Sequence, residues 1–369
     1  MDFNAHAKPS AANVLFSQFI RYDRLYEMTK FALYNSNSTH VNIFIDSYSI
    51  IRKLYRMGSN LQIDDSYVIS SCLINLAIHL RAYFETRHRI TSKVFIIYGG
   101  ARPKNAISYV PSYNDRNIFQ EDSNSYLLEL VKDNLEVLNI LTPYLHEIYS
   151  VVDYTNEFST ITSALIDKLS ADDDKKRTPN IIYSKDTLAY QLVAFKPYTF
   201  LYRPKKSYSS DNSWVVTKST LYNAYRNGEL GLTSIINTDL HVQMFSIYQA
   251  ISGVRSRGLK SIKTANTALT SLDQAVKDNI FFNGYNASAL TNSTPNPFQR
   301  LFENSPKVNY MEVQNRFYAI DLPYQTMLFG QTPEVSSIYS NIIDLYNPDE
   351  VKAINNKYFQ MFPLDLNRV

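Results

Sequence analysis

Short apolar strands alternate with amphipathic helices through the first half of the chain. Runs rich in β-branched and aromatic residues predict strands at 41–46, 93–99, 147–152 and 179–184, and stretches of helical periodicity separate them. A polar turn inside 197–216 predicts one more strand on each side of it. Helices of this length between strands are crossover connections, which join parallel strands of one sheet. The sequence therefore predicts an α/β fold, in which flanking helices cover a Rossmann-like parallel central sheet.

The second half of the chain changes character after residue 217. Helical periodicity recurs at 239–253, 264–280, 334–346 and 347–362. The intervening segment 284–315 is rich in Pro, Asn and Ser without periodicity, and it predicts a long connection. We therefore divide the chain into an N-terminal arm at 1–40, an α/β domain at 41–217, a mostly helical region at 218–290 and a C-terminal extension at 291–369.

Composition narrows the class of protein. The net charge is only +3, and no run approaches the roughly 18 consecutive apolar residues of a membrane span. The first residues, MDFNAHAKPSAAN, lack the pattern of a secretory signal, so we expect an intracellular protein without membrane contact. The single cysteine excludes a disulfide within the chain. The 29 Tyr and the abundant Asn suit an AT-rich genome such as that of a phage, which would place the protein in the bacterial cytoplasm.

Three acids follow predicted strands, where ligand sites of parallel sheets lie. Asp46 ends the first strand, Glu157 follows the strand at 147–152, and Asp186 follows the strand at 179–184. Carboxylates at one sheet edge are the oxygen ligands that Mg²⁺ and Mn²⁺ prefer. We therefore take these three acids as candidate metal ligands and, if the protein is an enzyme, as its catalytic residues. Each acid has an alternative role, because each precedes a predicted helix whose N-terminus it could cap or whose dipole it could oppose.

Basic residues gather in two places and are candidates for nucleic-acid contact. One group lies in a single short segment, which would bring several cations to one stretch of phosphate backbone. It consists of Arg255, Arg257, Lys260 and Lys263. The other group lies between the second strand and the next helix, where Tyr113 could also stack on an unpaired base. It consists of Arg102, Lys104, Tyr113 and Arg116. A merely solvated loop is the alternative for both groups.

Several segments, taken in order along the chain, form a set of motifs. They are Ile45-Asp46, Tyr98-Gly99-Gly100-Ala101-Arg102-Pro103-Lys104, Tyr113-Asn114-Asp115-Arg116, Glu157-Phe158-Ser159-Thr160, Ser184-Lys185-Asp186-Thr187-Leu188, and Gly253-Val254 with Lys263-Thr264-Ala265. In their order and spacing they resemble the 5′-nuclease, or flap endonuclease, family of the PIN-like superfamily. The chain departs from the family at positions where other residues stand in place of carboxylates, which are Tyr98, Ser159, Thr160, Leu188 and Val254. The resemblance covers roughly residues 41–270.

The resemblance implies a PIN-like sheet followed by a degenerate helix-hairpin DNA clamp. Members of the family hydrolyse phosphodiesters with two divalent cations held by a larger set of acids than this chain keeps. We therefore expect a catalytically degenerate protein that either binds branched or single-stranded DNA or serves as a structural subunit, with a protein partner on the C-terminal extension. For cofactors we expect none, or one Mg²⁺ or Mn²⁺ if Asp46, Glu157 and Asp186 converge.

Two alternatives remain open at the level of sequence. The chain could be an active Mg²⁺-dependent 5′-nuclease, either a flap endonuclease or a 5′–3′ exonuclease, with a reduced carboxylate site. It could also be an interaction protein with no nucleic-acid role, whose tyrosine-rich C-terminal third docks onto another subunit. We lean towards a protein that is not an enzyme.

Overall fold

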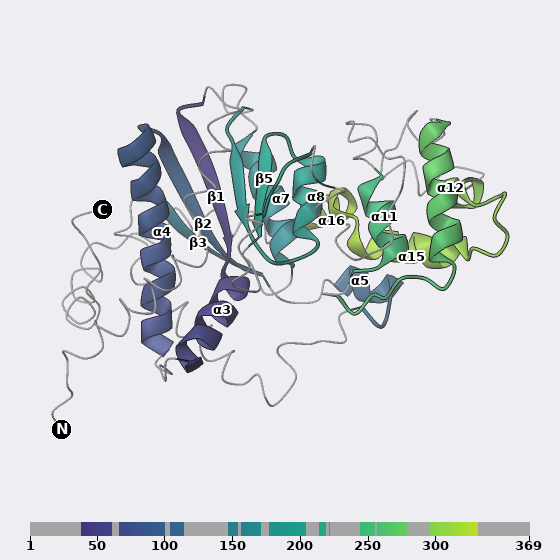
Figure 1. Ribbon diagram of the computed structural model, residues 1–369, viewed down its shortest axis with the longest axis horizontal. Helices are drawn as coiled ribbons and strands as arrows, with labels where there is room; N and C mark the ends of the chain where they lie inside the picture. The colour runs from purple at the N-terminus through teal and green to yellow at the C-terminus, as the bar shows by residue number, and fades with distance from the viewer. Residues whose placement is uncertain are drawn as a thin grey trace.

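A six-stranded sheet forms the centre of the protein (Figure 1). The computed structural model describes residues 38–60, 66–99, 104–113, 147–153, 156–170, 177–203, 214–218, 221, 244–254, 257–278 and 296–330. The strands are β1 (His40–Asp46), β2 (Thr91–Gly99), β3 (Ile148–Asp153), β4 (Asn180–Tyr183), β5 (Thr199–Arg203) and β6 (Trp214–Val216). All neighbouring pairs are parallel except β5 with β6, which is antiparallel. The α/β class predicted from the sequence is confirmed.

The strand order β3-β2-β1-β4-β5-β6 reverses its direction of growth at β1. The chain adds β2 and β3 on one side of β1, and then returns to add β4 and β5 on the other side. In open α/β sheets such a reversal leaves a crevice beyond the carboxyl ends of the two central strands. Asp46 and Ser184 stand at these two ends, because Asp46 closes β1 and Ser184 directly follows β4.

Helices cover both faces of the sheet (Figure 1). Helices α3 (Ser47–Asn60) and α4 (Ser66–His88) pack together on one side, and α4 lies along β2. Helices α7 (Phe158–Leu169) and α8 (Ala189–Phe195) pack on the other side, against β2 and β5 respectively. Strand β1 is therefore buried on both faces, which explains its continuous apolar run.

Helices from the second half of the chain extend this second layer. They are α11 (Phe245–Ser252), α12 (Ala265–Lys277), α14 (Pro297–Leu301), α15 (Tyr310–Ile320) and α16 (Leu322–Gly330). Helix α16 packs on α7 and α8, and α15 packs on α11 and on the short α5 (Lys104–Tyr109). One continuous cluster of buried apolar side chains runs from β1 to α16.

A buried glutamine ties the two halves together. The Gln191 side chain in α8 donates to the side chain of Gln249 at 2.7 Å and to the carbonyl of Ile320 at 2.9 Å. Its oxygen accepts from the Ser246 hydroxyl at 3.0 Å and from the backbone N–H of Leu322 at 2.7 Å. The amide therefore fills all four of its hydrogen-bonding positions with groups from α11 and from the junction of α15 and α16.

The long connection predicted at 284–315 is wrong in part, because α14 and the start of α15 lie within it. Asn296 and Asn309 cap these helices by accepting hydrogen bonds from the backbone N–H groups of Phe298 and Glu312. Asn and Pro are as typical of a helix start as of a turn, and here they begin helices. The helices predicted at 334–346 and 347–362 lie outside the described residues. Of the described helices, none has the length and apolarity needed to cross a membrane.

Candidate functional site

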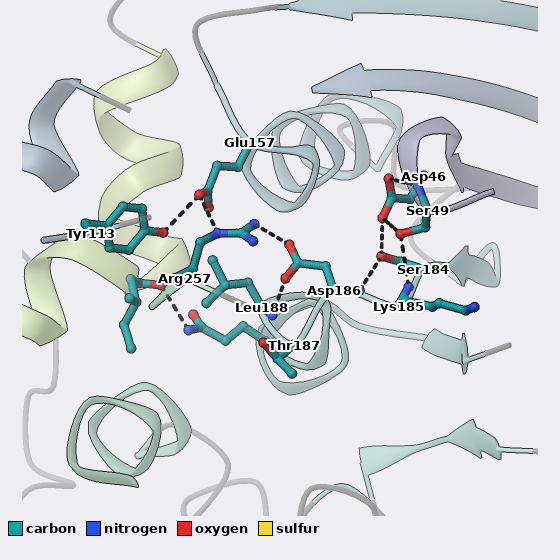
Figure 2. Close-up of polar contacts among 12 residues, drawn as sticks. Asp46, Ser49, Tyr113, Glu157, Ser184, Lys185, Asp186, Thr187, Leu188 and Arg257 are labelled. Atoms are coloured by element: carbon teal, nitrogen blue, oxygen red, sulfur yellow. Dashed lines mark hydrogen bonds and ion pairs between the residues drawn. The ribbon is translucent and has the colours of Figure 1, made fainter. Parts of the chain in front are cut away.

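Asp46 lies buried at the junction of β1 and α3, and three donor groups from two serines surround its carboxylate (Figure 2). It accepts a hydrogen bond from the backbone N–H of Ser49 at 3.2 Å and others from the hydroxyls of Ser49 and, at 2.6 Å, Ser184. The backbone contact caps α3, as one sequence-based interpretation proposed. Burial raises the pKa of Asp46, while the hydrogen bonds from both serines act in the opposite direction.

The loop between β4 and α8 is held to the start of α3. The Ser184 hydroxyl accepts from the backbone N–H of Asp186 at 3.0 Å while donating to Asp46. The backbone N–H of Lys185 reaches the Ser49 hydroxyl at 3.4 Å. Asp186 in turn accepts from the backbone N–H of Leu188 at 3.2 Å, which fixes one of its oxygens near the start of α8. The loop therefore presents the second oxygen of Asp186 away from Asp46.

Glu157 occupies the N-cap position of α7, but its side chain makes no capping hydrogen bond there. One of its oxygens instead accepts from the Tyr113 hydroxyl at 3.0 Å and from Nε of Arg257 at 2.7 Å. Burial raises the pKa of Glu157, the Arg257 charge opposes that rise, and the nearby Asp186 charge adds to it. The carboxylate thus depends on Arg257 for its counter-charge.

Arg257 lies between two of the candidate acids (Figure 2). Its Nε contacts Glu157, and a terminal nitrogen contacts Oδ2 of Asp186 at 2.5 Å. The arginine side chain is only 16% exposed. Burial alone would lower the pKa of Arg257, but the carboxylates of Asp186 and Glu157 raise it well above its usual value. The guanidinium is therefore charged and bound on two sides.

The structure brings the three predicted acids to one edge of the sheet. Asp186 lies in the middle, close enough for its charge to raise the pKa of both Asp46 and Glu157. The three do not share a cation site, since Asp46 faces serines and the other two face Arg257. Within the part of the chain that the structure describes, no group of three or more His, Cys, Asp or Glu side chains could hold a metal ion. These residues as arranged do not fit the divalent cations that the family resemblance implies.

Two candidate nucleic-acid contacts lie inside the protein instead of on its surface. The Tyr113 side chain is completely buried against Glu157, so it cannot stack on a base, and Arg257 is occupied by the carboxylates. Lys260 and Lys263 are exposed, as nucleic-acid contact requires. Three of the remaining candidates, Arg102, Arg116 and Arg255, lie outside the described residues. For the fourth, Lys104, the structure describes the backbone but not the side chain.

Sequence reasoning missed the partners of the acids. Ser184 belongs to one of the motifs, but nothing in the sequence pairs it with Asp46, 138 positions away. Arg257 was identified as a cation, yet its spacing among other basic residues suggested a surface role. The one available signal was that acids at a buried sheet edge need counter-charges. Which of the basic residues supplies the charge depends on the course of the chain between 186 and 257.

Comparison with known proteins gives matches among solved structures only. No model of a protein family matches the sequence, and no curated protein matches it. A bacteriophage T5 flap endonuclease variant, described as a pseudo-enzyme–product complex with DNA and metal ions, is 11% identical; the match covers 82% of this chain and 98% of that one, with a TM-score of 0.47. The T5 5′-exonuclease with bound zinc is 14% identical; the match covers 87% of this chain and 99% of that one, with a TM-score of 0.44.

Proposed function

We propose that this chain is a nuclease-like α/β protein that binds DNA without cleaving it. The observation that carries the proposal is the Arg257 guanidinium, which ion-pairs with Glu157 and Asp186. Hydrolysis by two metals needs free carboxylate oxygens that can hold cations roughly 4 Å apart. In this protein an arginine occupies two of the three retained acids, and serines bind the third. The protein therefore lacks free carboxylate oxygens to bind the metals that cleavage needs, whereas the surface around the three acids can still contact DNA.

The segment that follows Arg257 supplies the proposed DNA contact. Lys260 and Lys263 are exposed there, ahead of α12. A backbone hydrogen bond from Ile262 to Ile251 at 3.1 Å holds the segment to α11, and one from Leu259 to Val254 at 3.2 Å holds it to the turn after that helix. Exposed lysines bind phosphates electrostatically and without sequence preference, because ion release from the polyanion drives such binding.

A cleavage assay tests the first half of the proposal. Labelled flap, 5′-tailed and single-stranded DNA are incubated with the full chain in Mg²⁺ or Mn²⁺, with Asp186→Asn as the matched variant. We expect the wild type and the variant to give the same background as buffer alone. Metal-dependent cleavage that Asp186→Asn abolishes would overturn the proposal and favour an active 5′-nuclease.

A binding assay tests the second half. We expect the wild-type protein to bind DNA with measurable affinity at low salt. In Lys260→Ala/Lys263→Ala we expect the affinity to depend less on salt. The slope of log K against log salt should fall by about one for each lysine that no longer neutralises a phosphate. The control is Lys93→Ala, because Lys93 lies near the start of β2, at the end of the strand opposite to the edge where the three acids lie. Absence of binding at low salt would favour an interaction protein without a nucleic-acid role.

A further inference from the structure

One arginine joins three segments that are distant in sequence. Glu157 directly precedes α7, Asp186 follows β4, and Arg257 lies between α11 and α12. The two carboxylates bind different nitrogens of the guanidinium, at 2.7 and 2.5 Å. Charge-assisted hydrogen bonds of this length are the stronger class, and the planar guanidinium fixes the direction of each. The positions of the two acids and of the loop therefore depend on one another.

Charge balance explains why a cation must occupy this place. Glu157 and Asp186 have side chains only 7% and 9% exposed, so that water screens neither carboxylate well. Two poorly solvated negative charges side by side repel each other and also lose hydration energy. A guanidinium between them offsets both costs, and the Tyr113 hydroxyl satisfies one more oxygen lone pair of Glu157. A divalent cation would offset the same costs if it could reach the two carboxylates.

We propose that Arg257 is the built-in cation of the Glu157–Asp186 carboxylate pair, and that the pair takes up a divalent cation only when this arginine is removed. The inference goes beyond the proposed function, since it holds whether or not the chain binds DNA. It also makes Arg257 a positioning residue, because the segment leading to Lys260 is anchored at the sheet edge through its guanidinium. The backbone of this segment is joined to α15 as well, where Arg316 donates to the Lys260 carbonyl.

The test is metal binding by Arg257→Ala in the full chain. Titration calorimetry with MnCl₂ is expected to show about one ion bound per Arg257→Ala chain and none per wild-type chain. In chelator, Arg257→Ala is expected to unfold at a lower midpoint temperature than wild type. In millimolar Mn²⁺ the midpoint of this variant is expected to rise by about 2 °C or more, because a ligand that binds only the folded state stabilises it. Wild type should show no such rise. Arg257→Lys keeps a charge at the site and should recover part of the midpoint without taking up metal.

Lys196→Ala is the matched control. Lys196 forms an ion pair with Asp167 at 2.6 Å, so its removal also leaves an acid without its partner, but that acid is single and 57% exposed. This variant should respond to Mn²⁺ as wild type does. The same Mn²⁺ uptake in wild type and in Arg257→Ala would overturn the proposal, and so would its absence from both.

A second variant covers the case in which Arg257→Ala does not fold. Adding Glu157→Gln removes one of the two uncompensated charges, so Arg257→Ala/Glu157→Gln should fold and should bind no Mn²⁺. If this double variant is as unfolded as Arg257→Ala, the arginine acts through packing and not as a counter-charge, and the proposal fails.

Discussion

Each of the three acids at the sheet edge has its own set of internal partners. Asp46 binds hydroxyls and a backbone N–H, Glu157 binds a phenol and a guanidinium, and Asp186 binds the same guanidinium and a backbone N–H. Hydrogen bonds to a buried charge contribute more to stability than those between neutral groups. At the level of single residues, these hydrogen bonds and ion pairs make the three side chains part of the structure of the edge.

The Ser184 hydroxyl offers the simplest residue-scale test. It donates to the buried Asp46 carboxylate at 2.6 Å and accepts from the backbone of Asp186. We expect Ser184→Ala to lower the free energy of unfolding by about 1.5–3 kcal/mol, the usual range for a hydrogen bond to a charged group. Urea denaturation at pH 7 measures the change. Ser271→Ala is the control, because its hydroxyl pairs with that of Ser305 between neutral groups, and a loss below about 1.5 kcal/mol is expected there.

The raised pKa of Asp46 predicts that the stability of the protein depends on pH. The pKa of this carboxyl in the folded protein is raised above the ordinary value of 3.8, mainly by burial. The folded state therefore holds this proton more tightly than the unfolded state does, and the contribution to stability is complete below pH 3.8 and is lost as the pH rises through the folded-state value. We therefore expect the difference in free energy of unfolding, Asp46→Asn minus wild type, to increase as the pH is raised from about 4 to 7. Parallel pH profiles for the two proteins would contradict this.

At the scale of elements, the turn after α11 determines where Arg257 and the lysines lie. Gly253 ends the helix with φ of 88°, in the region that favours glycine. A Cβ added there would lie 2.6 Å from the carbonyl oxygen of Leu259 and 2.6 Å from the carbonyl carbon of Lys260. The chain returns so closely on itself that only glycine fits at this point.

Gly253→Ala is therefore expected to distort the whole turn. The positive φ costs on the order of 1–3 kcal/mol, and the contact with backbone atoms adds to this cost because they cannot move aside independently. Thermal unfolding measures the loss, and the DNA affinity should fall together with it if Lys260 and Lys263 bind phosphate. Gly258→Asn serves as the control. Gly258 is exposed, and its φ of 71° lies in the left-handed region that Asn adopts more readily than other non-glycine residues. Equal losses for both variants would argue against the close approach.

At the scale of the whole molecule, one apolar core joins the sheet to the helices that follow it. Phe317 in α15 is fully buried and packs on Phe298 and Tyr318, within the same cluster as residues of β1 and α7. Residues 296–330 were assigned to a C-terminal extension, yet α16 lies against α7 and α8. Unfolding should therefore be cooperative across both parts.

Phe317→Ala tests that cooperativity. We expect a loss of about 3–5 kcal/mol, typical for deletion of a buried Phe ring, in a single calorimetric transition shifted to lower temperature. Met311→Ala on the same helix should change the free energy of unfolding by less than about 0.5 kcal/mol, because Met311 is 57% exposed. Two separate transitions, of which only one moves in Phe317→Ala, would show instead that the extension folds independently.

Local pattern was enough to predict much of the fold. Each predicted strand lies within a few residues of an observed one, because runs such as Val41–Asp46 and Lys93–Gly99 are apolar on both faces and suit only a buried parallel strand. Helices α14 and α15 were not predicted, since their Asn-rich starts also suit turns. Their place in the core follows from contacts of α15 with α11 and α5 and of α14 with α12, which no sequence window contains.

The sequence alone shows that Asp46, Glu157 and Asp186 each follow a predicted parallel strand, and the carboxyl ends of such strands share one edge of the sheet. That the three acids converge at this edge is a result of the structure. Only the tertiary structure decided what those acids do. Whether a carboxylate holds a cation from solution or one from its own chain depends on which side chain folds back to within about 3 Å of it. In this protein a turn that only Gly253 permits leads to Arg257, and the guanidinium lies where Glu157 and Asp186 need a positive charge.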